Sequence, residues 1–154
     1  MYHDVITLFN RYKSRAGDIW FPTVIHNVNV NIDRASVIAR MGTESQDKVI
    51  VNIKYDTDTD GHTFVGDEGK EYFPPKKWEE HLVEDLKYYV TINPQDGFDF
   101  FVVGEVLYEG FDQILDNDFP DGFFDFVSNR YDYVFAVTSV TQLSVIPHFE
   151  ITGK

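Results

Sequence analysis

Residues 24–32 read VIHNVNVNI, and this stretch decides the fold because apolar and polar side chains alternate along it. One predicted face carries four aliphatic side chains and a histidine: Val24, His26, Val28, Val30 and Ile32. The other face would carry Ile25 and three asparagines. A period of two residues is that of a β-strand with one face on a core and the other in water. Similar stretches recur along the chain, so we predict an all-β protein.

Working outward, we predict strands at 5–12, 19–32, 49–55, 88–92, 98–108, 133–141 and 143–151. The strand at 49–55 would point Val49, Val51, Ile53 and Tyr55 inward. Proline has no amide hydrogen to give to a ladder, so Pro22 predicts an edge, a strand start or a bulge, and Pro147 predicts an edge.

The turn sequence Asn-Pro-Gln-Asp-Gly at 93–97 predicts that strands 88–92 and 98–108 form a hairpin. The second of these strands lacks alternation, so both of its faces should be covered, with Gly104 at a bulge or bend. Residues 33–40 fit either a short strand or a helical turn, and 42–47 fit a loop.

Two short helices are predicted. One follows the pair of prolines at 74–75 and runs to about residue 82, with Trp78 as its anchor. The other covers 122–130 with Asp121 as its cap, and its packing face would carry Phe123, Phe126 and Val127. The predicted fold is a single small β-barrel or β-sandwich of antiparallel strands, with one or two short helices and long loops, spanning residues 1–154 as one domain.

The composition limits the class of protein. It is 43% hydrophobic and 16% aromatic, which favours a folded chain over a disordered one. No apolar run approaches the roughly eighteen residues of a membrane span, and the start at Met1 lacks the features of a signal peptide. We therefore expect a soluble protein made in the cytoplasm. The absence of cysteine excludes disulfides and thiolate chemistry.

The formal net charge is −13, from 26 acidic and 13 basic residues. Such a chain should repel nucleic acid and anionic membranes, so tight DNA binding is not expected. Two interpretations of the charge stay open. Excess carboxylates commonly maintain solubility, and they would also form a repulsive wall that lets DNA pass without being held.

The acidic loop DTDTDG at 56–61 has the spacing of a calcium loop, with Asp56, Asp58 and Asp60 at alternate positions and Gly61 sixth. Asp67 would be the twelfth residue of this loop. A strand precedes the loop where an EF-hand would have a helix, and an Asp-Gly hairpin tip explains the same residues. A bound cation and a plain turn are therefore both retained.

No motif for catalysis is present. The chain has no P-loop, no dinucleotide-binding glycine motif and no GxSxG elbow. The five histidines lack the spacing of a metal-binding helix, and His26 is interpreted as structural. We predict that the protein is not an enzyme and has no cofactor.

Several segments resemble the small neck proteins of tailed bacteriophages, which are the head-completion, stopper or minor capsid proteins of the virion. These segments are DVITLFNRY at 4–12, DIWFPTVI at 18–25, FPPKKW at 73–78, TINPQDG at 91–97 with FVVGE at 101–105, and PHFEITGK at 147–154. The resemblance spans most of the chain. It does not include the loop at 56–69 or the acidic stretch at 109–121.

The resemblance implies a β-barrel subunit of a homo-oligomeric ring, a hexamer or dodecamer, between head and tail. Its partners would be a portal or adaptor protein and a tail terminator or tail tube protein, and DNA would pass through without specific binding. The location would be the virion, after synthesis in the host cytoplasm. Edges at Pro22 or Pro147 could then pair across subunits. Candidate interface anchors next to turns are Trp20, Phe21, Phe73 and Trp78, and the alternative is that these side chains plug the barrel ends.

Two other classes remain. One is a carbohydrate- or calcium-binding β-module of a phage tail, which would use the aromatic side chains and the loop at 56–61. Sugar arrays or calcium titration would identify it. The other is a small enzyme on a β-barrel, which a hydrolase screen would identify.

Overall fold

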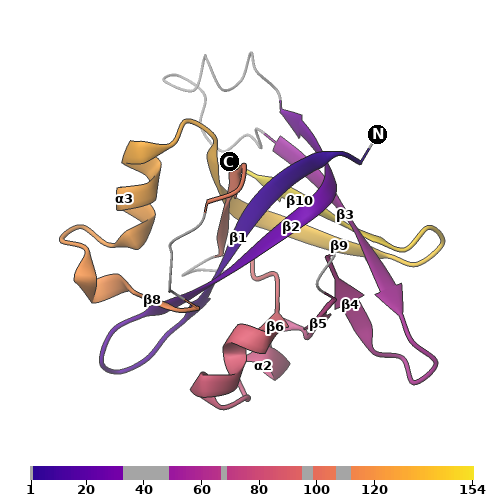
Figure 1. The fold of residues 1–154 in the computed structure, drawn as a ribbon, viewed down its shortest axis with the longest axis horizontal. Coiled ribbons are helices and arrows are strands. Elements are labelled where there is room, and N and C mark those ends of the chain that lie inside the picture. The colour runs from indigo at the N-terminus through magenta and orange to yellow at the C-terminus, as the bar shows by residue number, and fades with distance from the viewer. Residues whose placement is uncertain (1, 33–48, 67–68, 95–98, 107–111) are drawn as a thin grey trace.

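The computed structural model describes residues 2–32, 49–66, 69–94, 99–106 and 112–154. Its strands are β1 (Asp4–Tyr12), β2 (Ile19–Ile32), β3 (Val49–Thr57), β4 (Thr63–Val65), β5 (Lys70–Tyr72), β6 (Tyr89–Val90), β7 (Phe100–Val103), β8 (Ile114–Leu115), β9 (Val134–Leu143) and β10 (His148–Gly153). The helices are α2 (Pro75–Trp78) and α3 (Phe123–Arg130), with 3-10 turns η1 (Val83–Tyr88) and η2 (Asp116–Asp118) (Figure 1). No helix in these described ranges is long and apolar enough to cross a membrane.

Six strands close into an antiparallel barrel. The order is β1-β2-β3-β10-β9-β7, and β7 pairs with β1 again to complete the circle. Strands β4 to β6 extend from β3, and β8 adds to the start of β2. The predicted all-β fold is confirmed, and of the two architectures considered the barrel is the one adopted.

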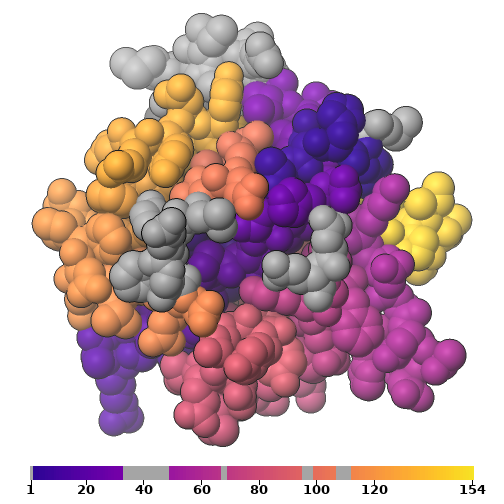
Figure 2. Space-filling view, viewed as in Figure 1, coloured from indigo at the N-terminus to yellow at the C-terminus, as the bar shows by residue number. Residues whose placement is uncertain are grey.

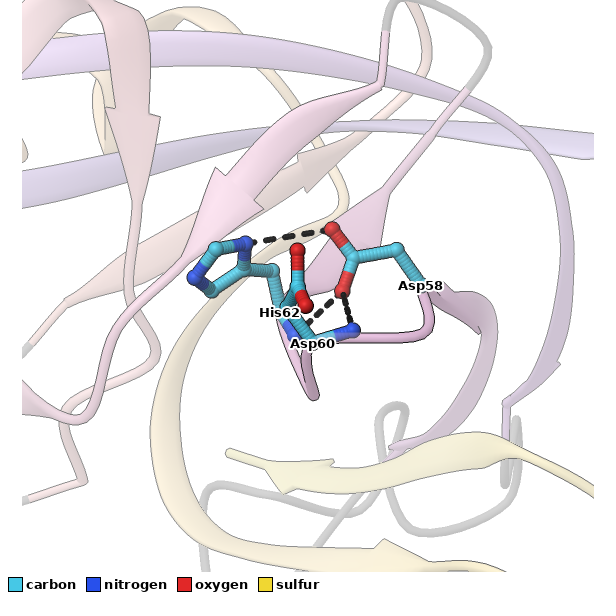
Figure 3. A group of neighbouring side chains, drawn as sticks. All are labelled: Asp58, Asp60 and His62. Carbon is cyan, nitrogen blue, oxygen red and sulfur yellow. Dashed lines mark hydrogen bonds and ion pairs between the residues drawn. The ribbon is translucent and has the colours of Figure 1, made fainter.

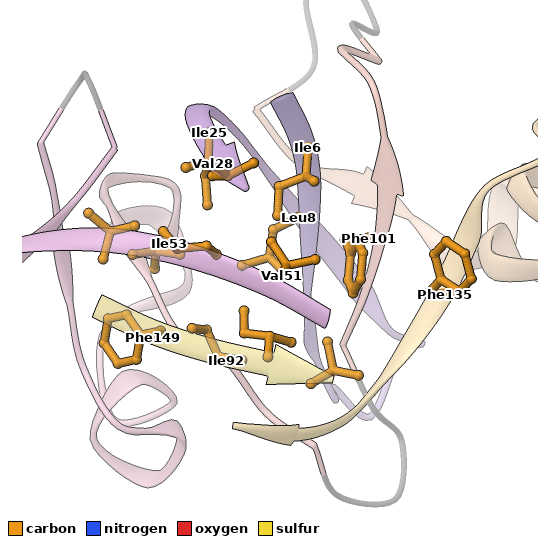
Figure 4. Close-up of a cluster of buried hydrophobic side chains, with 14 of the residues drawn as sticks. Ile6, Leu8, Ile25, Val28, Val51, Ile53, Ile92, Phe101, Phe135 and Phe149 are labelled. Carbon is orange, nitrogen blue, oxygen red and sulfur yellow. The ribbon is translucent and has the colours of Figure 1, made fainter. Parts of the chain in front are cut away.

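The barrel interior is filled by side chains and is not a pore. Ile6 and Leu8 of β1 meet Val51 and Ile53 of β3 across it, together with Phe149 of β10 (Figure 4). All five side chains are at most 1% exposed. A small barrel of this kind has an interior just wide enough for side chains. The predicted inward face of β3 is confirmed, since Val49, Val51, Ile53 and Tyr55 are all buried.

A second core lies between the outer face of the barrel and α3. Phe9 of β1 stacks on Phe100 of β7 with ring centroids 4.9 Å apart, and Phe123 of α3 meets Phe9 edge-on at 5.1 Å. Phe101, the neighbour of Phe100, points into the barrel. Both faces of β7 are therefore covered, as its lack of alternation predicts, and Gly104 ends the strand in a bend with φ of 126°.

The predicted faces of β2 are partly wrong because the strand contains a bulge. Asp4 pairs with Val28 but Val5 pairs with His26, so Asn27 is an extra residue, with φ of 57°. One inserted residue reverses the side-chain alternation. Ile25 is consequently buried and His26 exposed on one side of the bulge, whereas Val28 is buried on the other side.

We expect Asn27→Ala to lower the free energy of unfolding by about 1–2 kcal/mol, because a left-handed conformation strains an ordinary L-residue by that amount. Asn27→Gly is the matched control and should cost less, since glycine adopts positive φ freely. Urea denaturation followed by circular dichroism measures both. Equal losses for the two variants would contradict the assignment of strain to this residue.

Three expectations about strand pairing are resolved. Pro22 pairs with Phe9, and its carbonyl accepts a hydrogen bond from Lys70 Nζ at 3.3 Å. Among the described strands Pro22 has β1 alone as a ladder neighbour, so of the three alternatives predicted for it (an edge, a strand start or a bulge) the structure agrees with a local edge. Pro147 is not at an edge, because it lies in the turn between β9 and β10. The hairpin of 88–92 with 98–108 is also wrong, since β6 pairs in parallel with β5.

The two predicted helices are present with corrected ends. α2 closes after a single turn at Trp78, and η1 follows it. The cap of α3 is not Asp121: Gly122 occupies the N-cap, and the first amide, that of Phe123, donates to Asp116 Oδ1 at 2.9 Å. The predictions for 33–40, 42–47 and most of the turn at 93–97 lie outside the described residues.

Candidate functional site

The four aromatic residues proposed as interface anchors contribute mainly to the core of the subunit. Trp20, Phe21 and Trp78 are each at most 2% exposed, and Phe73 is half-buried. Trp20 belongs to the core under α3, whereas Phe21 and Trp78 meet at 5.9 Å where α2 packs on β2. This burial leaves little of Trp20, Phe21 and Trp78 for a neighbouring subunit to contact, and none of the three belongs to the cluster that fills the barrel interior.

The loop between β3 and β4 brings three potential metal ligands together. They are Asp58, Asp60 and His62, whose ligand atoms all lie within 4.8 Å of one another (Figure 3). Asp56, the first ligand of the predicted calcium loop, is outside this group because it is still paired in β3. His62 was missed because it is the seventh residue of the calcium-loop pattern, where the ligand is a backbone carbonyl and the pattern specifies no side chain. Asp67, the proposed twelfth ligand, lies outside the described residues.

Hydrogen bonds within this loop account for its shape. Asp58 Oδ1 accepts from the amides of Asp60 and His62 at 3.0 and 2.8 Å, and Oδ2 lies 3.1 Å from His62 Nδ1. The amide of His62 is the main cause that lowers the pKa of Asp58. An Asp side chain that accepts from its own turn is a common way to close a hairpin. The geometry therefore allows a cation but does not require one.

Asp99 is the one carboxyl group that the described structure buries, at 1% exposure. Its Oδ1 accepts from the amide of Arg11 at 2.9 Å. Its Oδ2 accepts from the side chain of Asn10 at 2.9 Å and from the amide of Asn93 at 2.8 Å. Burial raises the pKa of Asp99 to about 7, against these hydrogen bonds, which favour the carboxylate. Since Asp99 joins β1 to the chain on either side of 95–98, we interpret it as a structural link.

The β9–β10 hairpin presents the most exposed apolar residues of the described structure. Val145 is 96% exposed and Ile146 is 72% exposed. They lie in the turn, and the hairpin projects from the side of the barrel (Figure 1). The sequence interpretation placed both residues inside a strand. Ser144 and Pro147, which favour turns and flank this pair, are the signal that would have identified the tip.

A shallow pocket of about 330 Å³ lies beside α3. It is lined by two aromatic rings, three charged side chains and their neighbours: Phe119, Pro120, Asp121, Gly122, Asp125, Phe126, Asn129 and Arg130. Phe119 and Phe126 are in contact, with ring centroids 4.7 Å apart, and both are half-buried. The Arg130 guanidinium lies 5.5 Å from the Phe126 ring. This pocket was not predicted, because it depends on how the turn before α3 folds back on the helix.

These features define a class, the small antiparallel β-barrel protein with a packed interior and a projecting apolar hairpin. The chain belongs to DUF6751, a family of unknown function whose model matches residues 1–154. No curated protein and no solved structure matches the chain significantly.

Proposed function

We propose that this protein is a structural component of a tailed-phage virion. It forms a ring in the head–tail connector, or neck, which joins the portal or adaptor protein to the tail and surrounds the DNA channel. The observation that carries the proposal is the projecting hairpin with Val145 and Ile146 exposed. An exposed apolar element on an otherwise acidic surface is typical of a contact site between proteins. The resemblance of the sequence to phage neck proteins supports the same conclusion.

The filled barrel determines how such a ring would enclose DNA. Since side chains occupy the barrel interior, the channel lies between subunits and not through any one of them. The net charge of −13 suits the wall of a DNA channel, because each phosphate contact that is absent lowers the affinity of the wall for the passing DNA. The proposed partners are further copies of the chain in a hexamer or dodecamer, the portal or adaptor on one side, and the tail terminator or tail tube on the other.

The test is negative-stain imaging and mass photometry of the purified protein, alone and with the portal or adaptor protein encoded beside it. We expect a ring, either in solution or on the portal complex, because many ring proteins assemble only against a partner. A protein that stays monomeric in both experiments would contradict the neck assignment.

The second candidate is a calcium- or carbohydrate-binding β-module of a phage tail, which the grouping of Asp58, Asp60 and His62 favours. If this candidate is correct, millimolar Ca²⁺ should raise the melting temperature of the wild type. Asp58→Asn should abolish the rise, whereas Asp56→Asn, a matched change outside the group, should keep it. A melting temperature that Ca²⁺ leaves unchanged would remove the calcium-binding form of this candidate.

A further inference from the structure

The tip of the β9–β10 hairpin, Val145 and Ile146, is held in position by contacts with Tyr55 of β3 and with His148. Tyr55 of β3 donates from its hydroxyl to the Leu143 carbonyl at 2.8 Å and from its amide to the Pro147 carbonyl at 3.4 Å. His148 Nδ1 lies 2.6 Å from the carbonyl of Ile146. Val145 and Ile146 thus lie in a turn whose conformation is fixed by contacts with β3 and with His148. A turn that is already ordered loses less conformational entropy on binding than a flexible loop does.

The hairpin is also unusual in its charge. No Asp, Glu, Lys or Arg occurs between Asp132 and Glu150, although 25% of the whole chain is charged. In a protein of net charge −13, most surface segments would repel a second copy. An uncharged projecting segment can approach an acidic copy without that repulsion. This favours another copy of the same chain as the partner of the tip.

The pocket beside α3 is a fitting receptor for such a tip. Phe119 and Phe126 form its apolar wall, and Asp121, Asp125 and Arg130 lie around them. These three charged side chains form no ion pair with any part of the chain that the structure describes. An acidic tip would face the two carboxylates, whereas the uncharged tip can place its aliphatic side chains on the rings and leave the charged groups in water.

The two surfaces lie on opposite sides of the molecule. The hairpin tip projects at the right of Figure 1 and α3 lies at the left, and the same separation is visible in Figure 2 between the yellow and orange surfaces. A contact between two different patches is head-to-tail, so each copy can bind one neighbour on each side. Repetition of such a contact gives a ring when the rotation closes.

We propose that the hairpin tip of one copy, at Val145 and Ile146, docks in the α3 pocket of the next copy against Phe119 and Phe126. This inference rests on the proposed ring function and names the contact that builds the ring.

Engineered cysteines test the contact directly, because the native chain has none. Two single variants are mixed under mild oxidation, Val145→Cys on the tip and Asn129→Cys in the pocket. We expect a disulfide-linked dimer of one copy of each variant, seen on a non-reducing gel and located by mass spectrometry. The matched control replaces Asn129→Cys with Lys76→Cys, an exposed position on α2, and should yield no cross-link above background. The mixtures are examined both alone and on the portal complex.

The outcomes separate the contact from the ring. Rings without the Val145–Asn129 cross-link would overturn the docking contact and leave the proposed function standing. Neither rings nor cross-link would overturn both. The double variant Val145→Ser/Ile146→Ser should raise the protein concentration for half-assembly on the order of tenfold or more, since it removes two aliphatic side chains that the proposed contact would bury. Leu82→Ser changes another exposed aliphatic residue and should leave the concentration for half-assembly unchanged. Equal effects of the two substitutions would contradict a specific role of the hairpin tip in assembly.

Discussion

Replacing Trp20 with alanine is expected to lower the free energy of unfolding by about 3–5 kcal/mol, the usual range for removing a buried aromatic side chain. Trp20 is 1% exposed and meets Phe100 edge-on at 4.9 Å. Its Nε1 donates to Asp116 Oδ1 at 2.9 Å, and the same oxygen caps α3. The substitution therefore removes packing and the polar link between β2 and α3 together. Urea denaturation followed by circular dichroism measures the loss.

Trp20→Phe is the control for this experiment. It keeps an aromatic ring in the core but loses the hydrogen bond to Asp116, so we expect a loss of about 1–3 kcal/mol. Measuring both stability and assembly also distinguishes a core role of Trp20 from an interface role. A variant Trp20→Ala that unfolds like the wild type but no longer assembles would show that Trp20 is an interface anchor, contrary to its burial.

Asp99 is expected to make the protein less stable as the pH rises from about 4 to about 7. Burial raises the pKa of Asp99 from 3.8 to about 7, so the folded state keeps its proton to a higher pH than the unfolded state does. The stabilisation is complete below about pH 4 and is lost as the pH approaches 7. A shift of this size corresponds to about 4 kcal/mol in the free energy of unfolding.

The measurement is urea denaturation of the wild type and of Asp99→Asn at pH 5 and at pH 8. Asparagine carries no titrating proton, so the difference between the two proteins isolates the contribution of Asp99 from that of the other acids. Between these pH values the variant should gain roughly 2–3 kcal/mol relative to the wild type. A difference that stays constant would show that the pKa of Asp99 is not raised in the folded protein.

Sequence periodicity located most of the barrel strands because it reports a local property. Each of β1, β2, β3 and β9 was anticipated within a few residues. Pairing was harder to predict, because it depends on residues far apart in the chain. β7 lies between β1 and β9, whereas a hairpin with the segment just before it was expected.

The candidate sites show the same contrast between local patterns, which the sequence reveals, and contacts between distant residues, which it does not. The loop at 56–61 was visible as a pattern, but the grouping of Asp58 and Asp60 with His62 follows from the hairpin turn. The environment of Asp99 could not be predicted, because its partners Asn10 and Arg11 are almost ninety residues away. Exposure of Val145 depends on where β9 ends and the turn begins, and the nearby apolar residues Leu143 and Ile146 hid this boundary in the sequence.

The sequence by itself determined that the chain forms β-strands, that it is strongly acidic and that it has no thiol chemistry. Those properties follow from local alternation and from composition. Only the tertiary structure decided that six strands close into a filled barrel, that the bulge at Asn27 reverses the faces of β2, and that Trp20 is buried while Val145 is exposed. Closure, register and burial arise from contacts between distant segments, and the period of a single strand carries no information about them.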